Sequence, residues 1–270
     1  MTKLFYAFTL SMMSLGLCGQ EVEAITKPSA DVTLSFVRSG LIKKTVVQQG
    51  DRVKQGQLLS QLESKLEENK VTQLKSSYEN KTKILAEENQ LALKKMDLKD
   101  LQDAYNDGVG TKKEVNHANA EVKSSEYTIQ QLEFENKQVK LQLEEAQILL
   151  EQTKLTSPVE GVIETVFADE GEGVERLTEI IRLVRIDPLW VDVPVPLSYK
   201  HLVRNKKTLP VKFGFGDNDE IVETEGKIIY QAALADPGSE TVVFRLEVAN
   251  PKGRLAGERV IIELSPSQVE

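Results

Sequence analysis

The chain has 270 residues, 40% of them hydrophobic, and a formal net charge of -8 at pH 7. This apolar content is enough for a folded core, and the length allows one large domain or two to three small ones. Lysines and arginines are mixed among carboxylates, so no basic face is expected and nucleic acid is not an expected partner. Two histidines and one cysteine are too few for a zinc site, a disulfide framework or a histidine-based catalytic centre, and we expect no enzyme activity.

The amino terminus has the pattern of a secretory signal peptide. Lys3 precedes the apolar run Leu4–Leu17, which small and polar residues follow. The run is shorter than the roughly 20 residues that cross a bilayer. We assign residues 1–24 to this signal, with cleavage after Ala24. An uncleaved anchor and lipid attachment at Cys18 are the alternatives, and the bulky residue directly before that cysteine disfavours the second.

Two long stretches in the middle of the chain lack both proline and glycine, the strongest helix breakers. In the second stretch, apolar and small residues recur at alternating steps of three and four, which is the heptad pattern of a coiled coil. These positions are Val115, Ala118, Val122, Ser125, Ile129, Leu132, Asn136, Val139, Leu143, Ala146 and Leu150. We therefore expect a helix that packs along one face.

The first stretch repeats the pattern less regularly. Its positions are Ile84, Leu91, Leu98 and Tyr105, with Leu66 and Leu101 beside them. Between the stretches, Asn106–Thr111 contains two glycines and predicts a turn, after which Thr111 is placed to cap the next helix with Glu114 as its capping-box partner. Two helices of about 42 residues joined so tightly must run antiparallel, as a rod roughly 60 Å long with an exposed tip.

An internal repeat flanks this predicted hairpin. Residues 40–62 and 161–183 match at a constant offset of 121. The matched pairs are Gly40 and Gly161, Ile42 and Ile163, Gly50 and Gly171, Asp51 and Glu172, Val53 and Val174, Leu59 and Ile180, and Leu62 and Leu183. Each half predicts a strand, a turn and a strand, with Gly50, Gly56, Gly161 and Gly171 as turn glycines. Such short strand pairs cannot bury a face separately, so we expect the halves to pack on each other.

These motifs resemble those of a known family. The segments Gly50–Leu59 and Leu155–Ile163 are similar to the two half-motifs of the split lipoyl, or barrel-sandwich hybrid, domain of periplasmic adaptor proteins, the HlyD-type membrane fusion proteins. Leu189–Val195, Val243–Pro251 and Leu255–Val260 are similar to the β-barrel domain of the same family. The order of half-lipoyl, hairpin, half-lipoyl and barrel is more specific than any single motif.

The resemblance implies an α+β multi-domain fold. A split lipoyl domain would comprise residues 34–62 and 154–187, with an antiparallel coiled-coil α-hairpin inserted at 63–153 and a small antiparallel β-barrel at 188–265. The residues themselves agree for the last part. Alternating apolar positions, Val242, Phe244, Leu246 and Val248 and then Val260, Ile262 and Leu264, have the period of strands.

The resemblance also implies a function. Proteins of this family are non-enzymatic adaptors in the periplasm, associated with the inner membrane, and they link an inner-membrane transporter to an outer-membrane channel. For this chain that implies export of small molecules with a transporter of the resistance-nodulation-division class, or alternatively an ABC exporter. Self-assembly as a hexamer or a trimer of dimers is implied, and neither a cofactor nor a metal is required.

The hairpin tip departs from the family pattern. Channel-docking members carry Arg, Leu and Ser at positions that fall here on Asp100, Ala104 and Thr111, and only Thr111 is a conservative match. An aspartate would repel a carboxylate that an arginine binds. The channel is then a different one, or contact is made through the tip residues alone, or no channel is bound. The tip residues are Asp107, Gly108, Val109, Gly110 and Thr111.

Two other classes of protein stay open. A lipoyl or biotinyl carrier would modify a lysine near Lys65, but this lysine lacks the Asp-Lys-Ala or Met-Lys-Met setting and the rod would displace a swinging arm. A purely structural exported coiled-coil protein is favoured only by the altered tip. The mass of the mature protein tests the first class, and crosslinking from Val109 tests the second.

Overall fold

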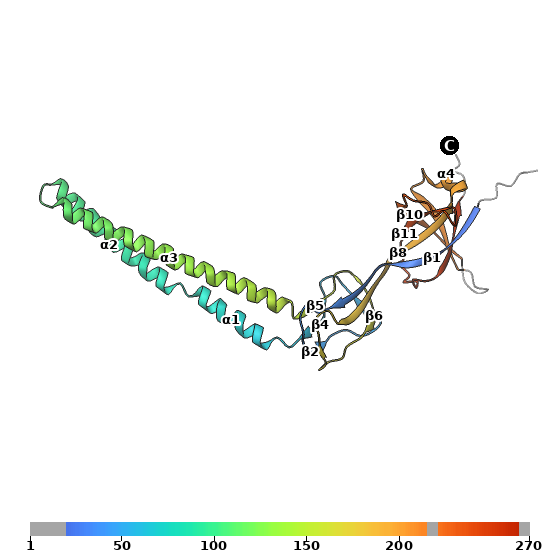
Figure 1. Cartoon of the computed structure of the whole chain (residues 1–270), viewed down its shortest axis with the longest axis horizontal. Coiled ribbons are helices and arrows are strands. Elements are labelled where there is room, and N and C mark those ends of the chain that lie inside the picture. Colours follow the sequence, from blue (N-terminus) through green and yellow to red (C-terminus); the bar gives the residue numbers. More distant parts are fainter. Residues whose placement is uncertain (1–19, 215–220, 265–270) are drawn as a thin grey trace, which may run out of the picture.

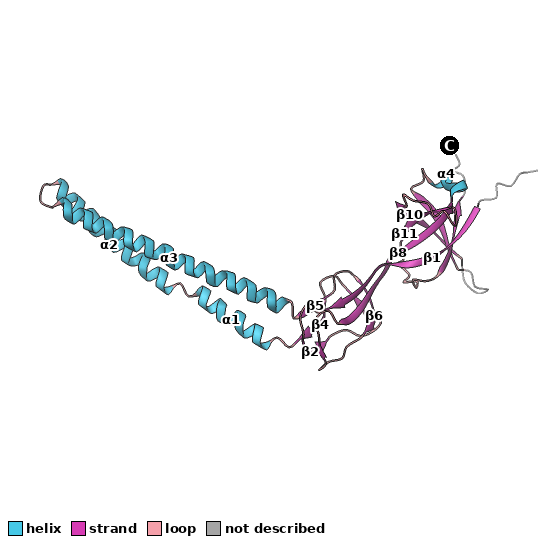
Figure 2. Cartoon of the chain, viewed as in Figure 1, coloured by secondary structure: helices cyan, strands magenta, loops and turns pink. Residues whose placement is uncertain are grey.

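The computed structural model describes residues 20–214 and 221–264. A helical rod, a two-sheet β unit and a β-barrel follow one another in a row (Figures 1 and 2). The elements in chain order are β1 (Gln20–Ser35), β2 (Gly40–Thr45), β3 (Arg52–Val53), β4 (Leu58–Leu62), α1 (Lys65–Glu79), α2 (Thr82–Asn106), α3 (Lys112–Glu151), β5 (Lys154–Thr156), β6 (Gly161–Val166), β7 (Gly173–Val174), β8 (Glu179–Pro196), a 3-10 turn (Leu197–Tyr199), α4 (Lys200–Val203), β9 (Thr208–Phe213), β10 (Val222–Gln231), β11 (Thr241–Val248) and β12 (Arg259–Leu264).

The barrel is closed by the first strand of the chain. Strands β1, β12, β9, β10, β11 and β8 pair in this order, and β8 pairs again with β1. Residues 20–25 of β1 pair with β12, and Thr26–Pro28 pair with Leu189–Val191. The range 188–265 expected for the barrel therefore leaves out its closing strand.

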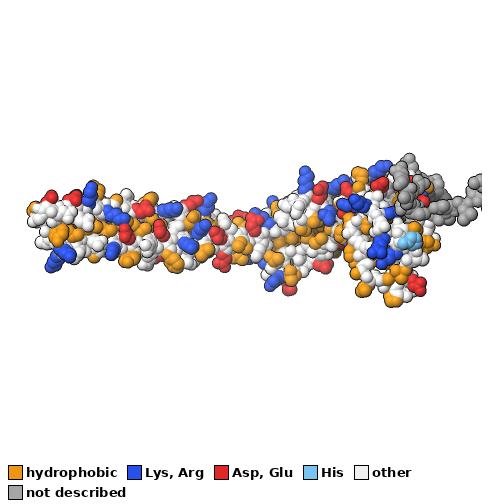
Figure 3. All heavy atoms as spheres, turned by 90° about the horizontal axis from the view of Figure 1, so that it is seen from above, with side chains coloured by type: hydrophobic (Ala, Val, Ile, Leu, Met, Phe, Trp, Pro, Cys, Tyr) orange, Lys and Arg blue, Asp and Glu red, His pale blue; other side chains and the backbone are white. Residues whose placement is uncertain are grey.

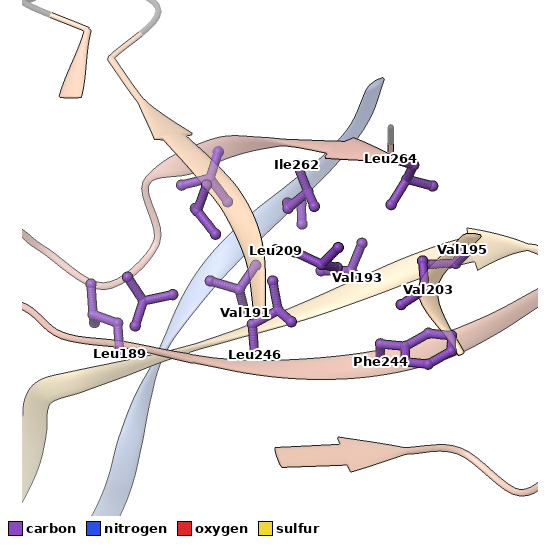
Figure 4. Packing of buried hydrophobic residues seen from close by; sticks show 14 of the residues in the cluster. Leu189, Val191, Val193, Val195, Val203, Leu209, Phe244, Leu246, Ile262 and Leu264 are labelled. Carbon is purple, nitrogen blue, oxygen red and sulfur yellow. The ribbon is translucent and has the colours of Figure 1, made fainter. Parts of the chain in front are cut away.

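The barrel core follows the alternation expected from the sequence. On β11 the residues Val242, Phe244, Leu246 and Val248 are buried, and their neighbours are half-buried. On β12 the residues Val260, Ile262 and Leu264 are buried and alternate with exposed or half-buried neighbours, so the predicted strand periods are confirmed. In Figure 4, Phe244 and Leu246 of β11 and Ile262 and Leu264 of β12 lie inside the barrel with Val191 and Val193 of β8 and Leu209 of β9. Each buried side chain of this size contributes about 1.5–3 kcal/mol.

The start of β1 conflicts with the expected cleavage after Ala24. Ala24 is buried in the barrel core, and Gln20–Ile25 form the ladder with Arg259–Leu264. Cleavage at this point would remove the part of the strand that pairs with β12. Residues 1–19 of the expected signal, including Cys18, lie outside the described residues.

The second part, which we call the split β unit, consists of residues 30–62 and 154–186. Its strands form the sheet β5-β4-β2-β7 and the segment β1-β8-β6-β3 of the larger sheet. The two halves exchange strands: β2 of the first half pairs with β7 of the second, and β6 of the second pairs with β3 of the first. The repeat is therefore confirmed, as an interlocked unit in which neither half closes alone.

The offset of 121 reappears in individual hydrogen bonds. The N–H of Ile42 donates to the carbonyl of Glu172 over 2.9 Å, and the equivalent N–H of Ile163 donates to Asp51 over the same distance. The N–H of Gly50 donates to Ile163 at 2.8 Å, and that of Gly171 to Ile42 at 2.9 Å. The backbone of the split β unit thus has an approximate two-fold symmetry, because each of these bonds from one half to the other recurs between the equivalent residues with the halves exchanged.

Three of the four expected turn glycines are turns, and one is not. Gly50, Gly56 and Gly171 have φ of +91°, +79° and +84°, which favours glycine. Gly161 instead begins strand β6 and pairs with Val53. A Cβ there would lie 2.5 Å from the carbonyl oxygen of Val184, so Gly161 is required by the close approach of β8.

Strands β1 and β8 join the barrel to the split β unit. Their first and second halves belong to different parts, and they pair with each other from Thr26 to Ser35 with register shifts after Pro28 and Leu34. Figure 1 shows this pair of strands running between the two parts. Because the connection is a hydrogen-bonded ribbon, it orders the two parts more firmly than a single-stranded linker would.

The rod consists of α3 on one side and α1 and α2 on the other (Figure 2). Every predicted seam position of α3, from Val115 to Leu150, is buried or half-buried, which confirms the heptad pattern. At the base, Leu74 packs with Leu143 and Ala146. No helix within the described residues combines the length and apolar character needed to cross a membrane.

The first arm of the rod differs from the expected single helix. It is interrupted at Asn80 and Lys81, where Asn80 has a non-helical ψ of 88°. Asn136 of the seam donates to the carbonyl of Tyr78 over 3.1 Å, which satisfies a backbone group next to the interruption. Two expected packing positions of this arm were wrong, because Tyr105 of the seam is 43% exposed and Leu66 of the row beside the seam is 81% exposed.

Candidate functional site: the tip of the rod

The rod tip is built by backbone hydrogen bonds to the end of α2. The N–H groups of Val109 and Gly110 both donate to the carbonyl of Ala104, at 3.0 and 3.1 Å, and that of Gly108 donates to Tyr105 at 3.1 Å. Gly108 has φ of +79°, and a Cβ on Gly110 would lie 3.2 Å from the nitrogen of Tyr105. Both glycines are therefore needed for so tight a turn.

The start of α3 has the capping box expected from the sequence. The N–H and hydroxyl of Thr111 donate to Oε2 of Glu114 at 2.9 and 2.7 Å, and the N–H of Glu114 donates to the threonine hydroxyl at 3.4 Å. The hydrogen bond from the Thr111 hydroxyl lowers the pKa of Glu114 most, and the bond from the Thr111 backbone N–H lowers it further, because both stabilise the ionised carboxylate. The prediction of a capped helix start is confirmed.

The exposed part of the tip is small and apolar at its centre. Val109 is 85% exposed, and Asp107 and Gly108 beside it are exposed as well. Asp100 lies further down α2 and is exposed, while Ala104 is half-buried beneath the turn. The structure thus brings together Ala104 and the turn, and it leaves Asp100 apart from them on the helix surface.

The polar side chains near the tip can be compared with those of a metal or catalytic site. Within the described residues, no group of three or more His, Cys, Asp and Glu residues could hold a metal ion. In the same residues, every buried side-chain nitrogen and oxygen has a hydrogen-bond partner. His117, the histidine nearest to the tip, is largely exposed and lies 3.6 Å from Glu121 on the same helix.

A second feature lies at the other end of the rod. A hollow of about 590 Å³ separates the base of α3 from the split β unit, and Phe36, Val37, Ile148 and Leu155 contribute to its walls. Val37 and Ile148 are 50% and 59% exposed. No pattern in the sequence predicted this hollow, because its walls come from two segments that are far apart in the chain, residues 35–37 and 144–155.

Comparison with known proteins gives structural matches alone. No family model matches the sequence, and no curated protein matches it. Among solved structures, MacA from Actinobacillus actinomycetemcomitans matches with a TM-score of 0.70 and 20% identity over 91% of this chain and 79% of that one.

The chain has the fold of MacA. A putative efflux transporter from Bacteroides eggerthii matches with a TM-score of 0.60 and 18% identity, over 96% of this chain and 72% of that one. The membrane fusion protein Spr0693 from Streptococcus pneumoniae R6 matches with a TM-score of 0.55 and 16% identity, over 90% of this chain and 99% of that one. At these identities the likeness concerns the fold.

Proposed function

We propose that this protein is a non-enzymatic periplasmic adaptor that links an inner-membrane efflux transporter to an outer-membrane channel. A transporter of the resistance-nodulation-division class is the favoured partner, and an ABC exporter is the alternative. The observation that carries the proposal is the placement of the rod between the two interlocked halves of the split β unit, with its tip far from both β parts (Figure 1). At 1.5 Å per residue, the 40 residues of α3 reach about 60 Å from the split β unit.

The fold supports a bridging role in two ways. Both arms of the rod, at the start of α1 and at the end of α3, are joined to the split β unit. A displacement at the base therefore reaches the tip through two connections instead of one. The tip exposes Val109 on a turn whose backbone is fixed by four hydrogen-bonded groups, which favours a preorganised contact. The named fold relatives, a putative efflux transporter and a membrane fusion protein among them, support export as the process.

Crosslinking from the tip tests the proposal. A photoreactive amino acid in place of Val109, in cells that make the full chain, is expected to capture an outer-membrane channel. The same group in place of Leu234, which is 85% exposed on the barrel, is expected to capture an inner-membrane transporter. As a control, the same group in place of Glu133, exposed halfway along the rod, is expected to capture neither. A Val109 variant without a channel adduct would support the structural coiled-coil alternative.

The carrier alternative has its own test. Lys65 is the first residue of α1, directly where the rod leaves the split β unit, which is a poor site for a swinging arm. We expect the intact mass of the purified protein to match the unmodified chain. An additional mass of a lipoyl or biotinyl group on Lys65 would overturn the proposed function.

A further inference from the structure

A basic segment lies at the end of the barrel that is remote from the rod. Residues 193–216 contain five Lys and Arg residues and no Asp or Glu, although acidic residues outnumber basic ones by 42 to 34 in the whole chain. We call four members of this segment, in and after α4, the basic rim: Lys200, which is half-buried, and His201, Arg204 and Lys207, which are exposed. A local excess of positive charge on an acidic protein is typical of a surface that meets an anionic partner.

The barrel core holds the basic rim in place. Val203 of α4 is 1% exposed and belongs to the barrel core, and Leu202 packs against the same core. The N–H of Arg204 donates to the carbonyl of Lys200 at 3.1 Å, which closes the turn between them. Figure 3 shows Lys and Arg side chains and a histidine close together on the barrel. The positive charges are thus carried by a segment whose backbone is fixed before any partner binds.

The carboxylates of the barrel leave the basic rim unpaired. In the part of the chain that the structure describes, no ion pair joins a carboxylate to a Lys or Arg of the basic rim. Lys212 on β9, by contrast, lies 2.9 Å from Glu263. The adjacent hairpin between β10 and β11 carries Asp236 and Glu240, and the carboxylate of Asp236 accepts the N–H of Gly238 at 2.8 Å. The charge of the basic rim is therefore available to a partner outside the chain.

Strand β1 begins at the same end of the barrel. Gln20 pairs with Leu264 of β12, and the antiparallel pairing of β12 with β9 places this end beside Thr208, which directly follows the basic rim. Figure 1 shows α4 and the start of β1 together, away from the rod. In the sequence the apolar run Leu4–Leu17 ends three residues before Gln20. Three residues span at most about 11 Å, so a membrane that holds this run lies about one Debye length from the rim.

We propose that the basic rim binds the anionic phospholipid headgroups of a membrane surface and holds this end of the barrel against it. The phosphate oxygens of the headgroups accept hydrogen bonds from guanidinium and ammonium groups. The potential of an anionic surface falls off within about 8 Å, so the acidic residues of the rod, which lie much further away (Figure 1), hardly oppose this contact. The inference rests on the proposed adaptor function, in which this end faces the inner membrane, and it names the residues and the class of lipid.

The residues that precede α4 favour a lipid surface over a free anion. Leu197 begins the 3-10 turn before α4 and is 45% exposed, and Tyr199 after it is half-buried. Apolar and amphipathic side chains next to cations gain free energy in the headgroup region of a bilayer. A phosphate ion in water offers such side chains nothing. The combination of Leu197 with the basic rim therefore matches a membrane surface.

The number of cations sets the expected strength of the contact. Each Lys or Arg near an anionic membrane surface raises binding about fivefold, so the three of the basic rim together account for about 100-fold. This contribution depends on salt, because the Debye length falls from about 10 Å at 0.1 M to about 3 Å at 1 M. A preference for anionic lipid that disappears in about 1 M salt is thus expected.

Vesicle binding tests the inference. The full chain, as purified from cells, is mixed with vesicles of phosphatidylcholine, with or without phosphatidylglycerol, and the bound fraction is measured by co-sedimentation. An apolar segment that inserts binds both kinds of vesicle, so the difference between them measures the contact with anionic lipid. The variant with Lys200→Gln, Arg204→Gln and Lys207→Gln is expected to bind the phosphatidylglycerol vesicles about 100-fold more weakly and the others unchanged.

A matched control separates the place of the charges from their number. The variant with Lys99→Gln, Lys123→Gln and Lys137→Gln loses three exposed lysines of the rod, so its net charge changes by the same amount. It is expected to change vesicle binding by less than about twofold, because these lysines lie many Debye lengths from the rim. Circular dichroism of both variants checks that they are folded.

Three results would overturn the inference. They are the absence of a preference for phosphatidylglycerol, an equal loss in both variants, and release of the protein by inorganic phosphate where chloride of the same ionic strength does not release it, which would mean a site for free phosphate. A photoreactive group in place of Arg204 is expected to capture phospholipid in cells, and capture of a transporter alone would contradict the proposal. Loss of the lipid preference with a retained Val109 adduct refutes only the basic rim, and the converse refutes only the channel contact.

Discussion

Leu177 occupies the backbone position that Gly56 occupies in the other half of the split β unit. The two residues are separated by the offset of 121, and both have positive φ, +65° for Leu177 and +79° for Gly56. Their N–H groups donate to equivalent carbonyls, of Phe36 at 2.9 Å and Ser157 at 2.7 Å. The turn is thus the same in both halves, but only the first half has a glycine, Gly56, which adopts a positive φ without strain.

Replacement of Leu177 by glycine should therefore stabilise the protein. A left-handed backbone conformation costs a non-glycine residue about 1–2 kcal/mol. A glycine at this position also adds conformational entropy to the unfolded chain, which offsets about 0.4–1 kcal/mol of that gain. We expect Leu177→Gly to raise the free energy of unfolding by about 0.5–1 kcal/mol, because the exposed side chain contributes little packing. This free energy can be measured by urea unfolding monitored by circular dichroism. The matched variant Gly56→Ala should lower the same quantity by about 1 kcal/mol, and a loss in both variants would contradict the explanation.

The interruption of the first arm has a cause in the heptad pattern. Tyr78 and Ile84, both half-buried, are six residues apart where the pattern of α3 requires seven. A non-helical residue advances about 3.3 Å and a helical one 1.5 Å, so the break at Asn80 lets six residues cover the height of seven. One alanine inserted between Asn80 and Lys81 should join α1 and α2 and increase the helical circular dichroism signal.

The same insertion in α3 serves as the control. An alanine between Lys137 and Gln138 turns the rest of the seam away from the first arm and should destabilise the rod by at least about 3 kcal/mol. The helical circular dichroism signal, recorded during thermal unfolding, distinguishes the two insertion variants. If both insertions destabilise the rod alike, a register mismatch is not the reason for the break.

Asp192 on β8 connects this strand to β11 and β1 of the barrel. We expect it to make the stability of the protein depend on pH. Its carboxylate accepts from Arg245 at 2.6 and 3.0 Å and from Lys27 at 3.1 Å, and Arg245 also lies 4.7 Å from the ring centre of Trp190. The hydrogen bonds from Arg245, and then from Lys27, lower the pKa of Asp192 against the opposing effect of burial. Asp192→Asn should cost about 1–2 kcal/mol at pH 7.

The sign of the pH effect follows from the lowered pKa. The stabilisation by Asp192 is fully present above the unfolded pKa of about 3.9 and is lost as the pH falls from there through the lower folded value. The difference between the wild-type chain and Asp192→Asn should be constant from pH 7 to about 5 and shrink below pH 4. Asp31→Asn breaks a more exposed pair with Arg182 and should cost less than about 1 kcal/mol. A difference that grows on acidification would refute this role of Asp192.

The pairing of β1 with β12 predicts where the mature chain begins. Because Gln20–Ile25 close the barrel, we expect the mass of the protein purified from cells to include Gln20. Ala24→Asp should cost about 2–4 kcal/mol, since it buries a carboxylate in the barrel core. Glu23→Lys, one residue earlier on the exposed face, should change the stability by less than about 0.5 kcal/mol. A mature chain that starts at Ile25 would contradict the structure.

The candidate site was predictable where it depends on short-range chemistry. The capping box of Thr111 and Glu114 and the exposure of Val109 follow from residue types within one turn, and the structure has both. The hollow at the base of α3 could not be foreseen, because it depends on how separate segments pack.

The sequence by itself determined the periodic elements of this protein. The α3 seam, the alternation on β11 and the repeat at an offset of 121 are patterns of side chains along the chain, and each has the same meaning in any fold. Tertiary structure alone decided the partners of each strand. Strand exchange within the split β unit and closure of the barrel by β1 depend on which backbone groups lie opposite each other. Such pairings join residues far apart in the chain, so no local pattern encodes them.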